Sequence, residues 1–276
     1  MASENRLIPT GATEELSLRV SVATLVRVEF QHPKDGNPML AFERRATLLT
    51  DGKRQSIRII CQPFGGAVRI QNLAGFQKLV GSFHFDSERS RSEQDFRIFI
   101  RPSDWDAVRG FCLRHFENGD ASVLEINPAR ELAEELTEAL HTELRSDQYT
   151  SKPLGTVTED NPAATENVNA RGYQTVRVYR IFEARILDPA LCQLMIANSE
   201  HYSNHDLREA ALQDARRGGK GRANALVTLP MKPLMEFYRR LSPETRNAPV
   251  IFVNNPLDSN VCAVLEDVPV PKYLST

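Results

Sequence analysis

The sequence predicts an α/β protein, in which amphipathic helices pack on a β-sheet. Apolar and polar residues alternate over residues 16–30, and a strand pattern returns over residues 173–186. Between these segments, apolar residues recur at steps of three and four over residues 128–145, as they do on an amphipathic helix. Strand and helix patterns that alternate along one chain are typical of α/β folds.

The composition is that of an ordinary soluble protein. Its 276 residues, 41% of them hydrophobic, allow one large domain or two small ones with a buried core. The formal charge of −2 disfavours nucleic acid as a partner held by bulk charge. We expect a cytoplasmic protein without a membrane partner, because no signal peptide or apolar run of ~20 residues is present. The four cysteines are too far apart for a zinc site or a disulfide framework: Cys61, Cys112, Cys192 and Cys262.

The N-terminal part predicts an antiparallel meander. After a loose lead-in at 1–14, residues 16–30 form one long strand with one buried face, or two strands joined by a bend. Turn residues at 32–38 lead to a second strand at 39–50, and Asp51-Gly52 is a strong hairpin signal. A third strand at Ser56–Gln62 completes the meander.

The third strand ends in an unusual segment, Pro63-Phe64-Gly65-Gly66. A proline, an aromatic residue and two glycines between strands predict a sharp backbone turn that another group can approach closely. The alternative is an ordinary tight turn.

Residues 72–127 predict a mixture of short elements. We expect a short helix at 76–80, a polar, arginine-rich loop at 87–92 and a strand at 96–100. A helix at 102–116 follows, with Trp105 in the core, and Gly119 ends it.

The helix at 128–145 separates into two faces. Pro128 suits the first turn of this helix, and Asn127 before it is a good N-cap. One face is apolar and comprises Ala129, Leu132, Ala133, Leu136 and Leu140. The other is acidic and comprises Glu131, Glu134, Glu135 and Glu138.

The acidic face has two interpretations. Like charges three and four positions apart repel by a few tenths of a kcal/mol per pair. A hard divalent cation such as Mg²⁺, which takes oxygen ligands, would offset this repulsion. The alternative is a solvated helix face.

The C-terminal half predicts further strands and helices. Residues 152–172 are rich in Pro, Gly, Asn and Thr and predict a long, mobile loop. The strand at 173–186 places Val176, Val178, Phe182 and Ile186 toward the core. Helices are expected at 189–198, 207–215 and 233–241, a last strand at 250–253, and an irregular tail at 269–276.

The segment Arg216–Arg222 is a glycine- and arginine-rich loop. Such a loop is suited to contact with phosphate or nucleic acid. The alternative is a solvated loop between two elements.

Two of these features together resemble the signature of the Nudix hydrolases. The segment Pro63–Gly66 after a strand, followed by Arg130-Glu131-Leu132-Ala133-Glu134-Glu135 on a helix, is similar to the Nudix box of that family. The resemblance implies an α/β/α sandwich around a mixed sheet. It also implies cleavage of a nucleoside diphosphate linked to another moiety, with Mg²⁺ or Mn²⁺ held by the box glutamates.

The resemblance assigns roles residue by residue. Glu131, Glu134 and Glu135 match the metal ligands, and Arg130 matches the arginine that orients a glutamate. Arg130, Glu134 and Glu135 are therefore the candidate catalytic residues. Gly65 and Gly66 match the glycines beside the site, and the flanking Arg58 and Arg69 are candidates for holding a phosphate. The implied partner is a nucleotide-derived small molecule, and the implied assembly is a homodimer.

The chain departs from the family pattern at several positions. Gly66 and Arg130 stand 64 positions apart (130 − 66), so an insertion at 72–127 splits the box. Glu125 lies five positions before Arg130, where the pattern has a glutamate eight positions before it. Thr137 and Glu138 replace the closing glycine and an aliphatic residue. We expect one Nudix-like domain over residues 15–268.

Three functions remain open. The first is a divalent-metal-dependent pyrophosphohydrolase, which the intact acidic hexad favours. The second is a degenerate Nudix domain that binds a nucleotide as a sensor or regulator without cleaving it, which the departures favour. The third is a purely structural domain with a solvated acidic helix. If Gly65 and Gly66 lay far from the acidic helix, the third would stand.

Overall fold

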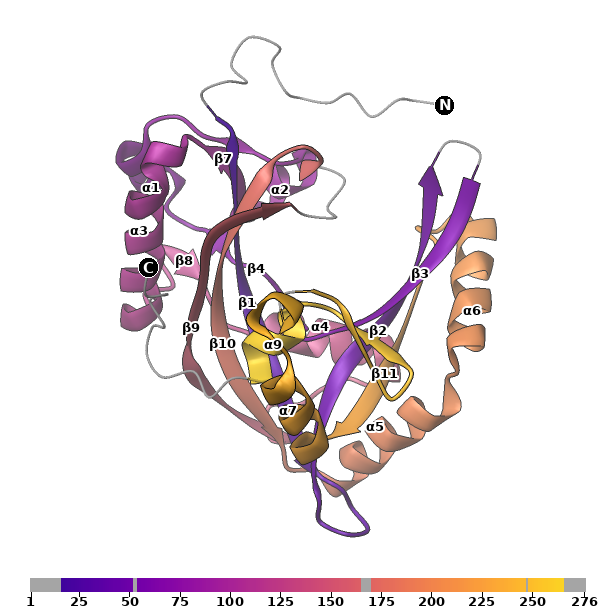
Figure 1. Cartoon of the computed structure of the whole chain (residues 1–276). Helices are drawn as coiled ribbons and strands as arrows, with labels where there is room; N and C mark the ends of the chain where they lie inside the picture. The colour runs from indigo at the N-terminus through magenta and orange to yellow at the C-terminus, as the bar shows by residue number, and fades with distance from the viewer. Residues whose placement is uncertain (1–15, 52–53, 165–169, 247, 266–276) are drawn as a thin grey trace.

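The computed structural model describes residues 16–51, 54–164, 170–246 and 248–265, so the predicted lead-in and the C-terminal tail lie outside the described residues. Eleven strands of the described chain form one mixed sheet, in the order β12-β13-β3-β2-β1-β10-β9 with four further strands beside this path (Figure 1). Their bounds are β1 Leu18–Gln31, β2 Pro38–Asp51, β3 Arg54–Gln62, β4 Phe64–Ala67, β6 His84–Phe85, β7 Arg97–Ile100, β9 Tyr149–Ala164, β10 Gln174–Ile186, β11 Arg222–Pro230, β12 Val250–Phe252 and β13 Asn255–Leu257. A separate pair consists of β5 Arg69–Ile70 and β8 Leu124–Glu125.

Helices cover both faces of the sheet, which confirms the predicted α/β class and the α/β/α arrangement (Figure 1). Their bounds are α1 Leu73–Val80, α2 Glu88–Glu93, α3 Trp105–Asn118, α4 Ala129–Leu140, α5 Pro189–His201, α6 Asn204–Arg216, α7 Met231–Arg240, α8 Pro243–Arg246 and α9 Asn260–Leu265, with a 3₁₀ turn at Pro102–Asp104. On one face, α4 and α5 pack on side chains such as Val26 and Leu226. On the other face, α7 and α9 pack on Leu25 and Val227. No helix within the described residues is long and apolar enough to cross a membrane.

Strand β1 lies at the centre of this sheet. It pairs in parallel with β10 along one edge, and with β2, β4 and β7 in succession along the other. Residues that point to opposite faces are both buried, as Leu25 and Val26 show. The prediction of one buried face is therefore wrong, because helices cover the sheet on both sides.

The predicted meander is confirmed, and the predicted glycine turn is corrected. Strands β1, β2 and β3 pair antiparallel in order, and Asp51 and Arg54 form the last pair of the second hairpin; Gly52 lies outside the described residues. Gly65 and Gly66 do not turn the chain. They lie within β4, which pairs with Leu25 and Thr24 of β1 after β3 has left β2.

The insertion at 72–127 ends close to where it begins. Strand β5, directly before the insertion, pairs with β8 near its end, with Arg69 opposite Glu125. Inside the insertion, the predicted helices and the strand near residue 98 are present, and Gly119 ends α3 with a φ of 63°. The predicted loop at 87–92 is wrong, because Ser87 caps the short helix α2 through the backbone N–H of Ser90.

The predicted mobile loop at 152–172 is also wrong. Most of it belongs to β9, a 16-residue strand that pairs with β10 at the edge of the sheet. Proline is tolerated at sheet edges and bulges, and Pro153 lies at a register shift opposite Phe182. Residues 165–169 lie outside the described residues.

The C-terminal helices are confirmed, with ends that differ by a few residues. In β10, Val176, Val178 and Ile186 are buried as predicted, whereas Phe182 is half-buried and lies under the guanidinium of Arg180. The predicted last strand at 250–253 is β12, which ends at Phe252. It is not the last element, because β13 and α9 follow it.

Candidate functional site

The acidic helix α4 lies directly against the glycine strand β4, although Gly66 and Arg130 are far apart in sequence. The β5–β8 pair brings the two ends of the insertion together and so places α4 beside β4. A Cβ atom on Gly66 would overlap the carboxylate of Glu131. The two halves of the split motif therefore meet in space, and Gly66 provides room for a carboxylate.

Helix α4 begins as predicted but is shorter than the segment 128–145. Asn127 accepts a hydrogen bond from the backbone N–H of Ala129 at 2.9 Å, so the asparagine caps the first turn. The helix ends at Leu140, and His141 follows with a φ of 53°. Leu132 and Leu136 are fully buried under the sheet, and this apolar face fixes which glutamates point toward β4.

Glu135 is the most buried glutamate of α4, at 8% exposed. Its Oε2 accepts a hydrogen bond from the backbone N–H of Gly65 at 2.8 Å, and its Oε1 lies 3.5 Å from Nη2 of Arg45. Burial raises the pKa of Glu135 well above its ordinary value, and the nearby carboxylate of Glu43 raises it further. The Gly65 N–H and Arg45 act in the opposite direction without cancelling that rise.

Three residues of the neighbouring strands support Glu135 and were not predicted as site residues. Glu43 on β2 is fully buried. It accepts hydrogen bonds from Arg45 Nη2 at 2.8 Å and from Gln62 Nε2 at 2.7 Å. The run Glu43-Arg44-Arg45 in the middle of an otherwise apolar strand was the available signal, because charged residues are rarely buried unless paired.

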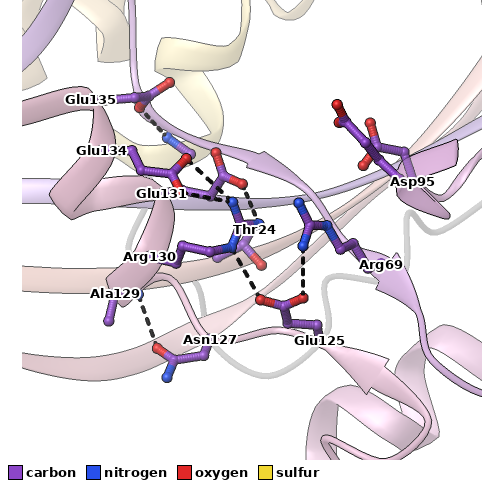
Figure 2. A network of polar contacts seen from close by, with 12 residues as sticks. Thr24, Arg69, Asp95, Glu125, Asn127, Ala129, Arg130, Glu131, Glu134 and Glu135 are labelled. Carbon is purple, nitrogen blue, oxygen red and sulfur yellow. Dashed lines mark hydrogen bonds and ion pairs between the residues drawn. The ribbon is translucent and has the colours of Figure 1, made fainter. Parts of the chain in front are cut away.

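Arg130 holds three carboxylates at once (Figure 2). Its guanidinium is 3.2 Å from Glu125, 2.5 Å from Glu131 and 3.3 Å from Glu134. The predicted contact between Arg130 and Glu134 is thus present, and Glu125 and Glu131 join it. Partial burial lowers the pKa of Arg130, but the carboxylates of Glu131, Glu125 and Glu134 outweigh this and raise it.

The remaining predicted residues differ in their distance from this cluster. Arg69 lies beside it, with Nη1 3.7 Å from Glu125 (Figure 2). Arg58 lies farther along β3, opposite Thr47, and roughly 13 Å of strand separates it from Gln62. Glu134 is exposed, and Glu138 accepts a hydrogen bond from Asn224 of β11 at 2.8 Å. The structure therefore brings Arg69, but not Arg58, to the acidic helix.

The donor chemistry of this cluster fits a hard divalent cation. Glu131 and Glu135 present carboxylate oxygens to the glycine strand, and such oxygens are the ligands that Mg²⁺ prefers. In this structure the guanidinium of Arg130 supplies the positive charge next to Glu131. No group of three acidic, histidine or cysteine side chains among the described residues converges closely enough to hold an ion without rearrangement.

Comparison with known proteins agrees with this geometry. Residues 17–227 match the model of the SMODS-associated NUDIX domain, and this match covers most of the chain. No curated protein and no solved structure matches the sequence. The matched region contains β4, the insertion and α4, and therefore both halves of the split motif. The chain belongs to the family of SMODS-associated NUDIX domains, and so to the Nudix superfamily.

Proposed function

We propose that this protein is a divalent-metal-dependent hydrolase that cleaves the pyrophosphate of a nucleoside diphosphate linked to another moiety. One observation carries the proposal. Two carboxylates of α4, those of Glu131 and Glu135, lie against the glycine strand β4, where Gly66 leaves room for one and Gly65 donates a hydrogen bond to the other. A purely solvated acidic helix would not need glycines in the adjacent strand.

In this proposal the residues of the site have distinct roles in binding metal and phosphate. Glu131, Glu134 and Glu135 would hold Mg²⁺ or Mn²⁺, with Arg130 keeping Glu131 and Glu134 on one side of the helix. When bound, such an ion lowers the pKa of an attacking water and offsets charge on the phosphoryl group. Arg69, whose Nη1 lies 3.7 Å from Glu125 beside this cluster, is the cation placed to contact a substrate phosphate.

A second candidate function is nucleotide binding without cleavage. Arg130 already forms ion pairs with Glu125, Glu131 and Glu134, so part of the repulsion between these carboxylates is offset without a metal ion. The high pKa of Glu135, caused by burial and by Glu43, also favours a neutral carboxylic acid, which is a poor metal ligand. This candidate predicts tight nucleotide binding with no turnover.

The experiment that separates the two functions is a hydrolysis panel. The purified protein is incubated with dinucleotides, nucleotide sugars and nucleoside triphosphates, each with Mg²⁺, Mn²⁺ or EDTA, and release of a monophosphate is measured. We expect metal-dependent release that Glu134→Gln and Glu135→Gln reduce on the order of 100-fold or more. Glu138→Gln is the matched control, because Glu138 lies on the same helix and contacts Asn224 instead of β4.

Two results would count against the hydrolase. If no member of the panel is turned over while a nucleotide binds tightly, the chain is a binding domain. If turnover occurs but Glu138→Gln and Glu135→Gln reduce it equally, the reaction takes place elsewhere on the protein.

A further inference from the structure

The loop between α6 and β11 carries a concentration of unpaired positive charge. Within seven residues it presents four basic side chains, Arg216, Arg217, Lys220 and Arg222, and all four are exposed. None of the four forms an ion pair with any residue of the described chain, in which most other arginines do. Because the whole protein has a formal charge of −2, this loop is a local basic patch on a slightly acidic molecule.

The backbone of the basic loop is held in place, although its side chains extend into solvent. The side chain of Asp214 accepts a hydrogen bond from the N–H of Arg222 at 3.1 Å, and its carbonyl accepts one from Gly219 at 2.9 Å. Gly221 has a φ of 66° and its carbonyl accepts from Leu48 of β2 at 2.8 Å. The acidic residue nearest the patch is thus used to fix the backbone and not to neutralise the cations.

The helix dipole of α6 explains why a cation is favourable at the end of that helix, but it does not explain the other cations of the loop. Cations near a helix C-terminus are favourable, and Arg216 ends α6. The effect falls off within the last turn, whereas Lys220 and Arg222 lie beyond the helix, the latter at the start of β11. The loop therefore carries more basic side chains than the C-terminus of one helix can favour.

We propose that the loop Arg216–Arg222 is a surface that binds the phosphate backbone of nucleic acid without reading its sequence. Exposed lysines and arginines on a fixed backbone contact phosphates and release counterions from a polyanion. The loop contains no aromatic side chain on which bases could stack, so it provides no base preference. It also contains no large apolar side chain of the kind that inserts into a lipid surface.

One arginine of the loop has a second arginine near it on the sheet. Arg222 and Arg58 both lie opposite Thr47 of β2, one on β11 and the other on β3. Residues paired directly across antiparallel strands point to the same face, so the two arginines flank Thr47 on one side of the sheet. The adjacent pair, Ala223 and Ala46, packs with α6 instead, so Arg222 and Arg58 point to the face of the sheet opposite α6.

The experiment measures nucleic-acid binding by fluorescence anisotropy, with a labelled 20-base-pair DNA of two unrelated sequences at 50 to 200 mM salt. We expect binding that is independent of sequence and weakens steeply with salt. The triple variant Arg216→Ala, Arg217→Ala and Lys220→Ala should bind roughly tenfold or more weakly at 50 mM salt. It should also lower the slope of log affinity against log salt by about 2 to 3.

A matched control comes from α7, which also carries one lysine and two arginines, all exposed. The variant Lys232→Ala, Arg239→Ala and Arg240→Ala removes the same charge from a different surface and should retain wild-type binding. The proposal is overturned if the wild type does not bind DNA at 50 mM salt, or if the two triple variants lose affinity equally. Binding to vesicles with anionic headgroups in the absence of DNA binding would also overturn it, in favour of a lipid surface. None of these results depends on the proposed hydrolase activity.

Discussion

Gly66 is one of two glycines at which the two halves of the site touch. The carboxylate of Glu131 occupies the space that a Cβ on residue 66 would fill. A methyl group there must displace either the glutamate or the strand, because β4 is paired with β1 and cannot shift freely.

We expect Gly66→Ala to lower the free energy of unfolding by about 1 to 3 kcal/mol and to reduce any metal-dependent activity. Urea denaturation and the hydrolysis panel measure the two effects. Gly110→Ala is the control, since an added Cβ in α3 would meet only Arg114 Nη1 at 3.7 Å, and alanine is the better helix former. A Gly66→Ala variant as stable and active as the control would show that the glycine is not required.

Glu135 makes a prediction about pH. Burial and the nearby Glu43 raise the pKa of Glu135 in the folded protein. In the unfolded chain the same carboxyl group ionises above about pH 4.3, so its ionisation favours the unfolded state. The free energy of unfolding of the wild type, relative to Glu135→Gln, should therefore be greatest near pH 4 and fall as the pH rises toward 8. Urea denaturation in EDTA at several pH values measures this difference.

The control for this pH dependence is Glu138→Gln, which changes an exposed carboxylate of the same helix. Its difference from the wild type should vary little between pH 4 and pH 8. If the wild type gained stability over Glu135→Gln as the pH rose, the carboxylate would be favourably ionised in the fold and our account of its burial would be wrong.

At the scale of elements, α4 is held against the sheet by its apolar face. Leu136 is 1% exposed and packs in the same cluster as Val26 and Leu226. We expect Leu136→Ala to cost about 2 to 5 kcal/mol in the free energy of unfolding, because it leaves a cavity under the helix. Glu138→Ala on the exposed face should cost within about 0.5 kcal/mol. Similar costs for both variants would mean that α4 is not anchored through this face.

The elements that sequence patterns predicted well are those with a clear local period. The meander, the acidic helix and the C-terminal helices follow from alternation or helical spacing, which local side chains determine. Strand β9 was missed because its Pro, Gly and Asn content is typical of a loop, and only pairing with β10 makes it a strand. The glycine segment has the composition of a turn for the same reason, since its pairing with β1 is nonlocal.

The site shows the same division between local and nonlocal information. The spacing of Arg130 to Glu135 on one helix was sufficient to predict a shared acidic face and the contact between Arg130 and Glu134. The burial of Glu135 and its partners Glu43 and Arg45 depends on how β2 and β4 meet under α4, which no local pattern encodes. The closing of the insertion by β5 and β8 is nonlocal as well.

For the whole molecule, the insertion and the sheet share one core. Phe76 and Phe96 of the insertion pack in the same cluster as Val20 of β1 and Val176 of β10. The single tryptophan, Trp105, lies in the insertion and reports on it selectively. We expect its fluorescence and the far-UV circular dichroism of the whole chain to follow one coincident transition in urea. A separate, earlier fluorescence transition would show that the insertion unfolds as a unit of its own.

The most direct test of the central claim, that α4 and β4 form a divalent-cation site, is Mn²⁺ binding measured by electron paramagnetic resonance at pH 7.5. We predict that the wild type and Glu138→Gln bind Mn²⁺ with similar affinity, whereas Glu131→Gln, which alters the carboxylate against Gly66, binds at least roughly tenfold more weakly. Equal binding by all three proteins, or no binding by the wild type, would contradict the claim.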